Sequence, residues 1–102
     1  DFLVLGSGAT VHNFRAMNFN AKGPDAWAVA FDDWLVDRIQ RKQLDELFRY
    51  EELAPNAKAA VPRPEHFVPL YLAFGSADPA SSATEVHRSY EMGSLSYLAV
   101  EF

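Results

Sequence analysis

The sequence contains no cysteine, which excludes a disulfide framework and a metal site built on thiolates. It has no apolar run near the roughly 20 residues that a membrane-spanning helix needs, and no stretch typical of a signal peptide. These absences predict a cytoplasmic protein. Basic residues are also few, because nine Lys and Arg stand against fourteen Asp and Glu, giving a net charge of −5. A nucleic-acid-binding surface is therefore excluded, since it needs clustered positive charge.

The composition favours one small domain. The chain has 102 residues, of which 49% are hydrophobic and 14% aromatic, enough for a modest core. Strand-like runs at both ends, with helical spacing between them, predict an α/β or α+β fold. Neither end carries a loose polar tail. We therefore expect residues 1–102 to be a single partial domain of a longer protein.

Apolar spacing predicts where the strands lie. Residues 2–5 form a continuous apolar run and predict a buried strand. Residues 85–92 predict a second strand. Residues 95–102 predict a third, in which the alternation of Leu98, Val100 and Phe102 places these side chains on one face.

The clearest helix is predicted to begin at Asp25, directly after a proline. Apolar residues then recur at helical spacing and form one stripe: Trp27, Ala30, Phe31, Trp34 and Leu35. Asp32 and Asp33 fall among the charged residues assigned to the opposite side. The two tryptophans are interpreted as core, with an aromatic pocket wall as the alternative.

Two further helices are predicted. A short one begins near Leu44 and ends by Pro55, and residues 54–62 are interpreted as a connection. The next begins at Pro64 and ends at Gly75. Pro69 lies inside it and lacks a backbone donor, so the first turn should be kinked in a way that aims His66.

Two histidines follow segments that restrict the backbone. His12 comes after Gly6-Ser7-Gly8, and His66 comes after Pro62 and Pro64. Either could be an ordinary core histidine, but the pair favours one site assembled by the fold. His87 is interpreted as a structural or surface residue. A phosphate-binding loop at the glycines is the weaker alternative, because no lysine and no third glycine complete the known motifs.

Four collinear stretches carry a family resemblance. Residues 4–15 (Val-Leu-Gly-Ser-Gly through His-Asn-Phe-Arg) and residues 64–70 (Pro-Glu-His-Phe-Val-Pro-Leu) contain the two histidines. Residues 26–35 (Ala-Trp-Ala through Phe-Asp-Asp-Trp-Leu) and residues 91–96 (Glu-Met-Gly-Ser-Leu-Ser) accompany them. Together they resemble extradiol aromatic-ring-opening dioxygenases, in particular the DOPA-dioxygenase-like relatives of the protocatechuate 4,5-dioxygenase β subunit.

The resemblance implies an oxidoreductase that opens a catechol-type ring with O₂. Fe(II) is the expected metal, held with open coordination positions, and Zn(II) is found at the equivalent position in structures of several DOPA-type members. His66 would be a metal ligand, and His12 would be either the acid/base beside the metal or a further ligand. Asn13 would orient the loop or a substrate oxygen.

The resemblance also implies that the chain is the C-terminal part of a larger mixed-sheet domain flanked by helices. Family members carry two more metal-site histidines in their N-terminal half. Residues 1–102 alone should therefore bind metal weakly and be inactive, and should act with the missing half or a partner chain. Assembly into a homo-oligomer stays open. The alternative is a non-catalytic folded fragment or binding subunit, whose aromatic faces pack against a partner.

Overall fold

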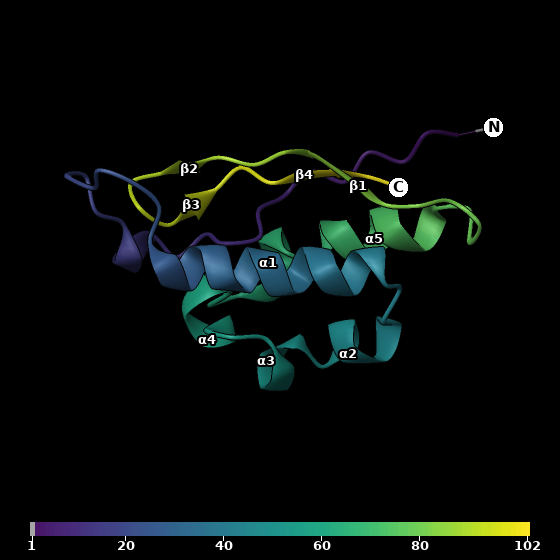
Figure 1. Ribbon diagram of the computed structural model, residues 1–102, viewed down its shortest axis with the longest axis horizontal. Helices are drawn as coiled ribbons and strands as arrows, with labels where there is room; N and C mark the ends of the chain where they lie inside the picture. The colour runs from purple at the N-terminus through teal and green to yellow at the C-terminus, as the bar shows by residue number, and fades with distance from the viewer. Residues whose placement is uncertain (1) are drawn as a thin grey trace.

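The computed structural model describes residues 2–102, and its elements lie in layers (Figure 1). One layer holds the strands β1 (Thr84–His87), β2 (Tyr90–Glu91), β3 (Leu95–Ser96) and β4 (Ala99–Glu101). Next to the strands lie the helices α1 (Ala26–Gln40) and α5 (Pro69–Ser76). Beyond α1 lie the short helices α2 (Leu44–Phe48), α3 (Tyr50–Leu53) and α4 (Ala57–Ala60). Two 3₁₀-helices complete the described elements, η1 (Phe14–Ala16) and η2 (Pro64–His66).

The strands form two antiparallel pairs, β1 with β4 and β2 with β3. The helices precede the strands along the chain instead of alternating with them, so residues 2–102 have the α+β form of the predicted fold class. Leu98, Val100 and Phe102 are each partly buried while the residues between them are exposed, which confirms the predicted face. Residues 2–102 by themselves form no larger mixed sheet.

The predicted buried strand over residues 2–5 is wrong for this structure. These residues form no strand, and Phe2, Leu3 and Leu5 are 88–98% exposed. An apolar run becomes a strand only when another strand accepts its hydrogen bonds and a second layer covers its side chains. Within residues 2–102 no strand pairs with this run.

The helix α1 begins directly after Asp25, as predicted. Phe31 and Leu35 are fully buried, whereas both tryptophans and Ala30 are only partly buried. The assignment of Asp32 to the charged side is wrong, because its exposed fraction is 0%. Strands cover one side of α1 and short helices the other, so more than one stripe is buried (Figure 1). Neither α1 nor another helix of residues 2–102 is long and apolar enough to cross a membrane.

The predicted helix near Leu44 is present as two short helices, α2 and α3, which meet at Arg49. The predicted connection over residues 54–62 contains a further helix, α4. The residue before it, Asn56, has a left-handed backbone conformation (φ 59°). Its small residues Ala57 and Ala60 are buried. These small residues let α4 pack close to α1. The carbonyl of Ala60, at the end of α4, lies next to the backbone of His12.

Pro69 divides the predicted third helix into η2 and α5, as its missing donor leads one to expect. The side chain of Phe67, between the two helices, is 1% exposed. It packs against Tyr50 and Phe31, with ring centroids 4.8 and 5.9 Å away. The preceding residue, His66, is exposed at the end of η2.

Candidate metal centre

The segment that carries His12 is buried and bonded to both neighbouring layers. The exposed fraction is 0% for Val11 and 8% for His12. The His12 amide donates to the carbonyl of Ala60 at the end of α4, with N and O 3.1 Å apart. The Val11 carbonyl accepts from the amide of Ser96 in β3, also at 3.1 Å. Helices and strands therefore fix the backbone of the same two residues.

A third backbone contact joins the two histidine segments. The amide of Ala9 donates to the carbonyl of His66 at 2.7 Å. A Cβ on Gly8 would lie 2.1 Å from that carbonyl oxygen, and one on Gly6 would lie 2.5 Å from the carbonyl oxygen of Pro69. Both distances are far too short for a side chain. The glycines of the opening turn are therefore explained by close packing against residues 66–69, without invoking a bound phosphate.

The fold brings the rings of His12 and His66 together, although 53 residues separate them in the sequence. Their ring centroids are 5.4 Å apart and their planes meet at 72°. With a metal–nitrogen bond of about 2.1 Å, two imidazoles on one ion have centroids about 5 Å apart. The separation therefore fits two ligands of one metal ion, and equally a ligand beside an acid/base.

One nitrogen of His12 has a defined partner. Its Nε2 lies 3.1 Å from the carbonyl oxygen of Arg63. A carbonyl can only accept, so Nε2 carries the hydrogen and the neutral ring keeps a lone pair on Nδ1. That Nδ1 is buried and has no hydrogen-bond partner within residues 2–102. An unpaired buried nitrogen with a lone pair can take a proton or bind a metal, which makes this ring chemically competent for either role.

Residues 2–102 contain no cluster of three or more His, Cys, Asp or Glu side chains that could hold a metal ion. Oxygen-activating Fe(II) sites commonly use two histidines and one carboxylate, with open positions for substrate and O₂. His12 and His66 therefore fit part of such a site, and any further ligand must come from outside these residues.

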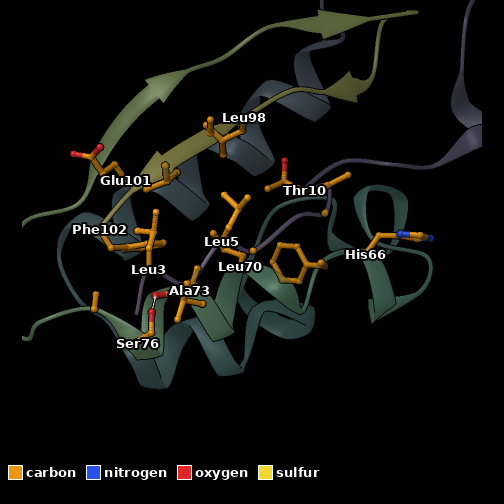
Figure 2. Close-up of a pocket in the computed structure, with 18 of the residues that line it drawn as sticks. Leu3, Leu5, Thr10, His66, Leu70, Ala73, Ser76, Leu98, Glu101 and Phe102 are labelled. Atoms are coloured by element: carbon orange, nitrogen blue, oxygen red, sulfur yellow. Dashed lines mark hydrogen bonds between the residues drawn. The ribbon is translucent and has the colours of Figure 1, made fainter. Parts of the chain in front are cut away.

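Two hollows open beside the histidines. One, of about 580 Å³, is lined by His66 together with residues of the opening segment, α5 and β4 (Figure 2). The other, of about 430 Å³, is lined by His12, Phe14, His87 and Tyr97 among others. Gly8 and Ala9 line both. The glycine-rich segment therefore stands between a hollow on the His66 side and a hollow on the His12 side.

Asn13 caps the turn that follows His12. Its Oδ1 accepts a hydrogen bond from the amide of Arg15 at 3.0 Å, at the start of η1. The side chain is thus bonded within its own turn, and its predicted role in the site stays a prediction. His87 is exposed, with its Nε2 2.8 Å from the Ser89 hydroxyl, in line with its interpretation as a surface residue.

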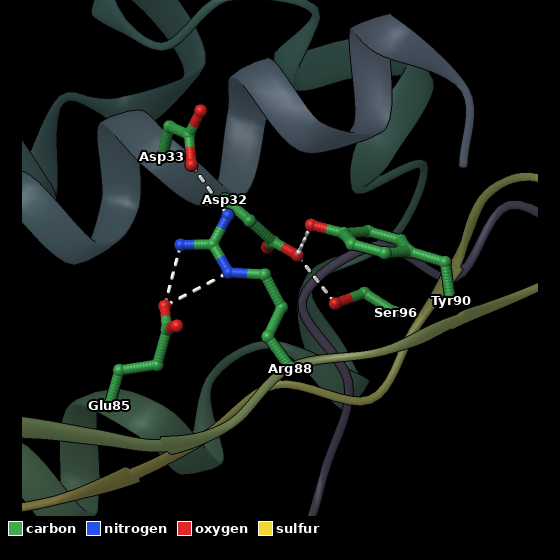
Figure 3. A network of polar contacts seen from close by, with 6 residues as sticks. All are labelled: Asp32, Asp33, Glu85, Arg88, Tyr90 and Ser96. Atoms are coloured by element: carbon green, nitrogen blue, oxygen red, sulfur yellow. Dashed lines mark hydrogen bonds and ion pairs between the residues drawn. The ribbon is translucent and has the colours of Figure 1, made fainter. Parts of the chain in front are cut away.

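The sequence interpretation missed a buried polar cluster around Asp32 (Figure 3). The Asp32 carboxylate accepts hydrogen bonds from the hydroxyls of Tyr90, at 2.8 Å, and Ser96. Burial raises the pKa of Asp32, and the hydroxyls of Ser96, Thr10 and Tyr90 oppose this rise. A signal was available: Ala28, Asp32, Leu35, Val36 and Ile39 follow one another at helical spacing.

Arg88 lies between the Asp32 group and two more exposed carboxylates (Figure 3). Its guanidinium donates to Glu85 and Asp33, each at 2.6 Å. Its positive charge favours ionised Asp32 and so partly counters the effect of burial on the pKa of that carboxyl. The strands are thus tied to α1 by a buried carboxylate and a more exposed ion pair next to it.

Comparison with protein families gives a match over almost the whole chain. Residues 1–100 match the family described as the catalytic LigB subunit of aromatic ring-opening dioxygenase. Proteins named 4,5-DOPA dioxygenase extradiol are similar in sequence: the one from Beta vulgaris is 39% identical over 100 residues, and the one from Portulaca grandiflora 35% over 101. Each alignment covers 98% of this chain but 37% of the relative.

A solved structure shares the fold. The crystal structure of an uncharacterised protein from Escherichia coli K12 superposes with a TM-score of 0.77 at 28% identity. The superposition covers 92% of this chain and 40% of the other protein. The described layers therefore correspond to part of a larger structure.

Proposed function

This chain belongs to the LigB family of extradiol aromatic-ring-opening dioxygenases, in its DOPA-dioxygenase-like branch, and from that premise we propose that it supplies part of a metal-dependent active site that opens a catechol-type ring with O₂. The chain spans about 37% of the length of its curated relatives. The proposal therefore concerns the complete domain, to which residues 1–102 contribute.

The observation that carries the proposal is the pairing of His12 with His66. Their rings lie 5.4 Å apart on segments that the sequence separates widely. A backbone hydrogen bond from Ala9 to His66 joins these segments. They pack so closely that Gly8 has no room for a side chain. A fold that needed only a core histidine would not require this second, exposed imidazole beside it.

We assign different roles to the two rings. His66 is exposed and would hold the metal, most simply Fe(II), with Zn(II) as a substitute. His12 is held through Nε2 by the Arg63 carbonyl, and its Nδ1 would accept the proton of a substrate hydroxyl. When bound, the metal would favour the ionised diol and the approach of O₂. The competing role of His12 as a second ligand is decided by the experiment below.

The hollow on the His12 side fits a single aromatic ring. Its volume of about 430 Å³ lies within the range of small-molecule sites. Phe14 and Tyr97 are 72% and 50% exposed and line this hollow, so an aromatic diol would meet apolar ring faces there. Asn13, which orients the turn between His12 and Phe14, would set the angle of this wall.

The test joins the chain to the preceding part of the Beta vulgaris relative and measures metal content and O₂ uptake with DOPA, catechol and protocatechuate under Fe(II). We expect H66A to lower metal affinity by more than about 100-fold, since even indirect metal contacts are worth 10- to 100-fold. We expect H12A to lower kcat by about 100-fold or more with metal retained. H87A is the control for metal content alone and not for O₂ uptake, because His87 lines the hollow on the His12 side.

The outcomes separate the alternatives. Equal loss of metal in H66A and H12A would make His12 a ligand. A joined protein that bound no metal and opened no catechol ring would refute the proposed activity. Metal loss in H87A as large as in H66A would show that the measured binding is not at the described pair.

A second candidate function is favoured by the exposed run that begins at Phe2. The exposed side chains of this run form an apolar surface whose contact with water is unfavourable: Phe2, Leu3 and Leu5. In this reading the chain is a non-catalytic subunit whose apolar surface is covered by the rest of a family domain. Size measurement of the chain with and without the preceding part of the relative tests it. Association without O₂ uptake favours this candidate, and a monomer that binds nothing excludes it.

A further inference from the structure

The Asp32 cluster reaches the His12 segment through one residue. The side chain of Ser96 donates to the Asp32 carboxylate (Figure 3). The backbone amide of the same Ser96 donates to the carbonyl of Val11. Val11 directly precedes His12. Thr10, two residues before His12, is 7% exposed, and its hydroxyl favours a lower pKa for the same carboxylate. Two hydrogen bonds therefore connect a buried group on α1 to the backbone that carries the candidate acid/base.

We propose that Asp32 is a positioning residue for His12, which it holds in register with His66 by anchoring Ser96 and Tyr90 on the strands. This inference rests on the proposed function only for the use made of His12. The positioning itself concerns the folded chain without metal or substrate, and is tested in that state.

The energetics favour a positioning role over a stabilising one. Removing a carboxylate from water is costly, and its hydrogen bonds recover only part of that cost. Burial raises the pKa of Asp32 in spite of these hydrogen bonds, the direction expected when the cost is only partly offset. A buried charged group is therefore weak evidence of a contribution to stability. A carboxylate at this position is therefore better explained by the geometry that its directed hydrogen bonds impose on two strands.

Asp33 provides a matched control. It is the next residue of α1, it carries the same charge, and it also pairs with the cluster through Arg88. It is exposed, however, and makes no hydrogen bond to Ser96 or Tyr90. D33N therefore removes a carboxylate from the same turn without touching the path to His12.

The experiment compares D32N, S96A, Y90F and D33N with the parent chain by amide hydrogen exchange and by the nuclear Overhauser contact between the rings of His12 and His66. In D32N we expect the protection of the His12 and Ser96 amides to fall by about tenfold or more, equivalent to 1.4 kcal/mol of local opening. The ring contact should be lost. Protection of the Leu35 and Ile39 amides in α1 should stay at the parental value, and D33N should match the parent throughout.

Each result decides the matter. A uniform loss of protection that includes Leu35 and Ile39 would show a merely structural role and overturn the inference, as would unchanged exchange at His12. If D32N fails to fold, S96A removes only one hydroxyl and gives the same selective or uniform answer. Failure of the metal test leaves this result standing, because no metal takes part. Metal binding with unaltered exchange in D32N would overturn the positioning role alone.

Discussion

The two histidine segments differ in the contacts that hold them. His12 lies on a buried segment whose backbone is bonded to α4 and β3. His66 is exposed, and its place depends on the neighbouring Phe67, which is packed into an aromatic cluster. The His12 segment is therefore bonded to a helix and a strand, whereas the His66 segment has one backbone bond, from Ala9, and relies on the hydrophobic packing of Phe67. The 5.4 Å separation of the rings depends on both sets of contacts. Each set can be removed by its own substitution.

The largest effect should come from removing the hydrophobic anchor. F67A deletes a side chain that is 1% exposed and packs against Phe31, Tyr50 and Tyr71. Such a truncation costs about 4 kcal/mol, from lost burial and the cavity left behind. Urea unfolding should show this loss in the free energy of unfolding. In the fraction that stays folded, the ring contact between His12 and His66 should disappear.

Phe14 gives the matched control on the other segment. It lies two residues after His12 and is 72% exposed. F14A should change the free energy of unfolding by less than about 0.5 kcal/mol, as for most surface substitutions. Equal losses in F67A and F14A would contradict the claim that the two segments are anchored differently.

A smaller loss is expected where the two segments touch. In G8A the new Cβ would meet the carbonyl oxygen of His66 at 2.1 Å, so the backbone must move apart. The bond from the Ala9 amide to that carbonyl would weaken at the same time. Overpacking of this kind costs about 3 kcal/mol. The readouts are the urea midpoint and the exchange rate of the Ala9 amide.

The control for this substitution is G75A. Gly75 lies in α5, and a Cβ there would meet no atom within 4 Å. Replacing a helical glycine by alanine should stabilise the chain by about 0.5–1 kcal/mol. If G8A were tolerated as well as G75A, close packing would not be the reason for the opening glycines.

Sequence reasoning located both rings but not what holds them. Backbone-restricting glycines and prolines mark His12 and His66 locally, and helical spacing marks α1. The Asp32 contacts join residues 58 and 64 positions apart, a distance at which spacing carries no signal. The error at residues 2–5 has a related cause, because an apolar run shows that a strand could be covered but not whether a partner strand lies beside it. Long-range partners decide both cases.

The smallest effect on the free energy of unfolding is expected for Asp32, which holds the His12 segment through polar contacts. Its sign is opposite to that expected for Phe67. Burial raises the pKa of Asp32 above 3.8, while Ser96, Thr10, Tyr90 and Arg88 oppose the rise. The folded chain therefore keeps this proton to a higher pH than the unfolded chain does. The cost of ionising Asp32 is absent below its unfolded pKa, grows as pH rises through the raised pKa, and is complete above it.

D32N removes this titration. The free energy of unfolding of D32N should therefore increase relative to that of the parent as pH rises from about 3 to about 7. The gain is about 1.4 kcal/mol for each pKa unit by which folding raises the Asp32 value. D33N, which changes an exposed carboxylate, should show no such trend. Urea unfolding at several pH values measures the difference, and a constant difference between D32N and the parent would contradict it. A higher free energy of unfolding in D32N would mean that Asp32 positions His12 at a cost in stability. Phe67, in contrast, positions His66 and stabilises the fold.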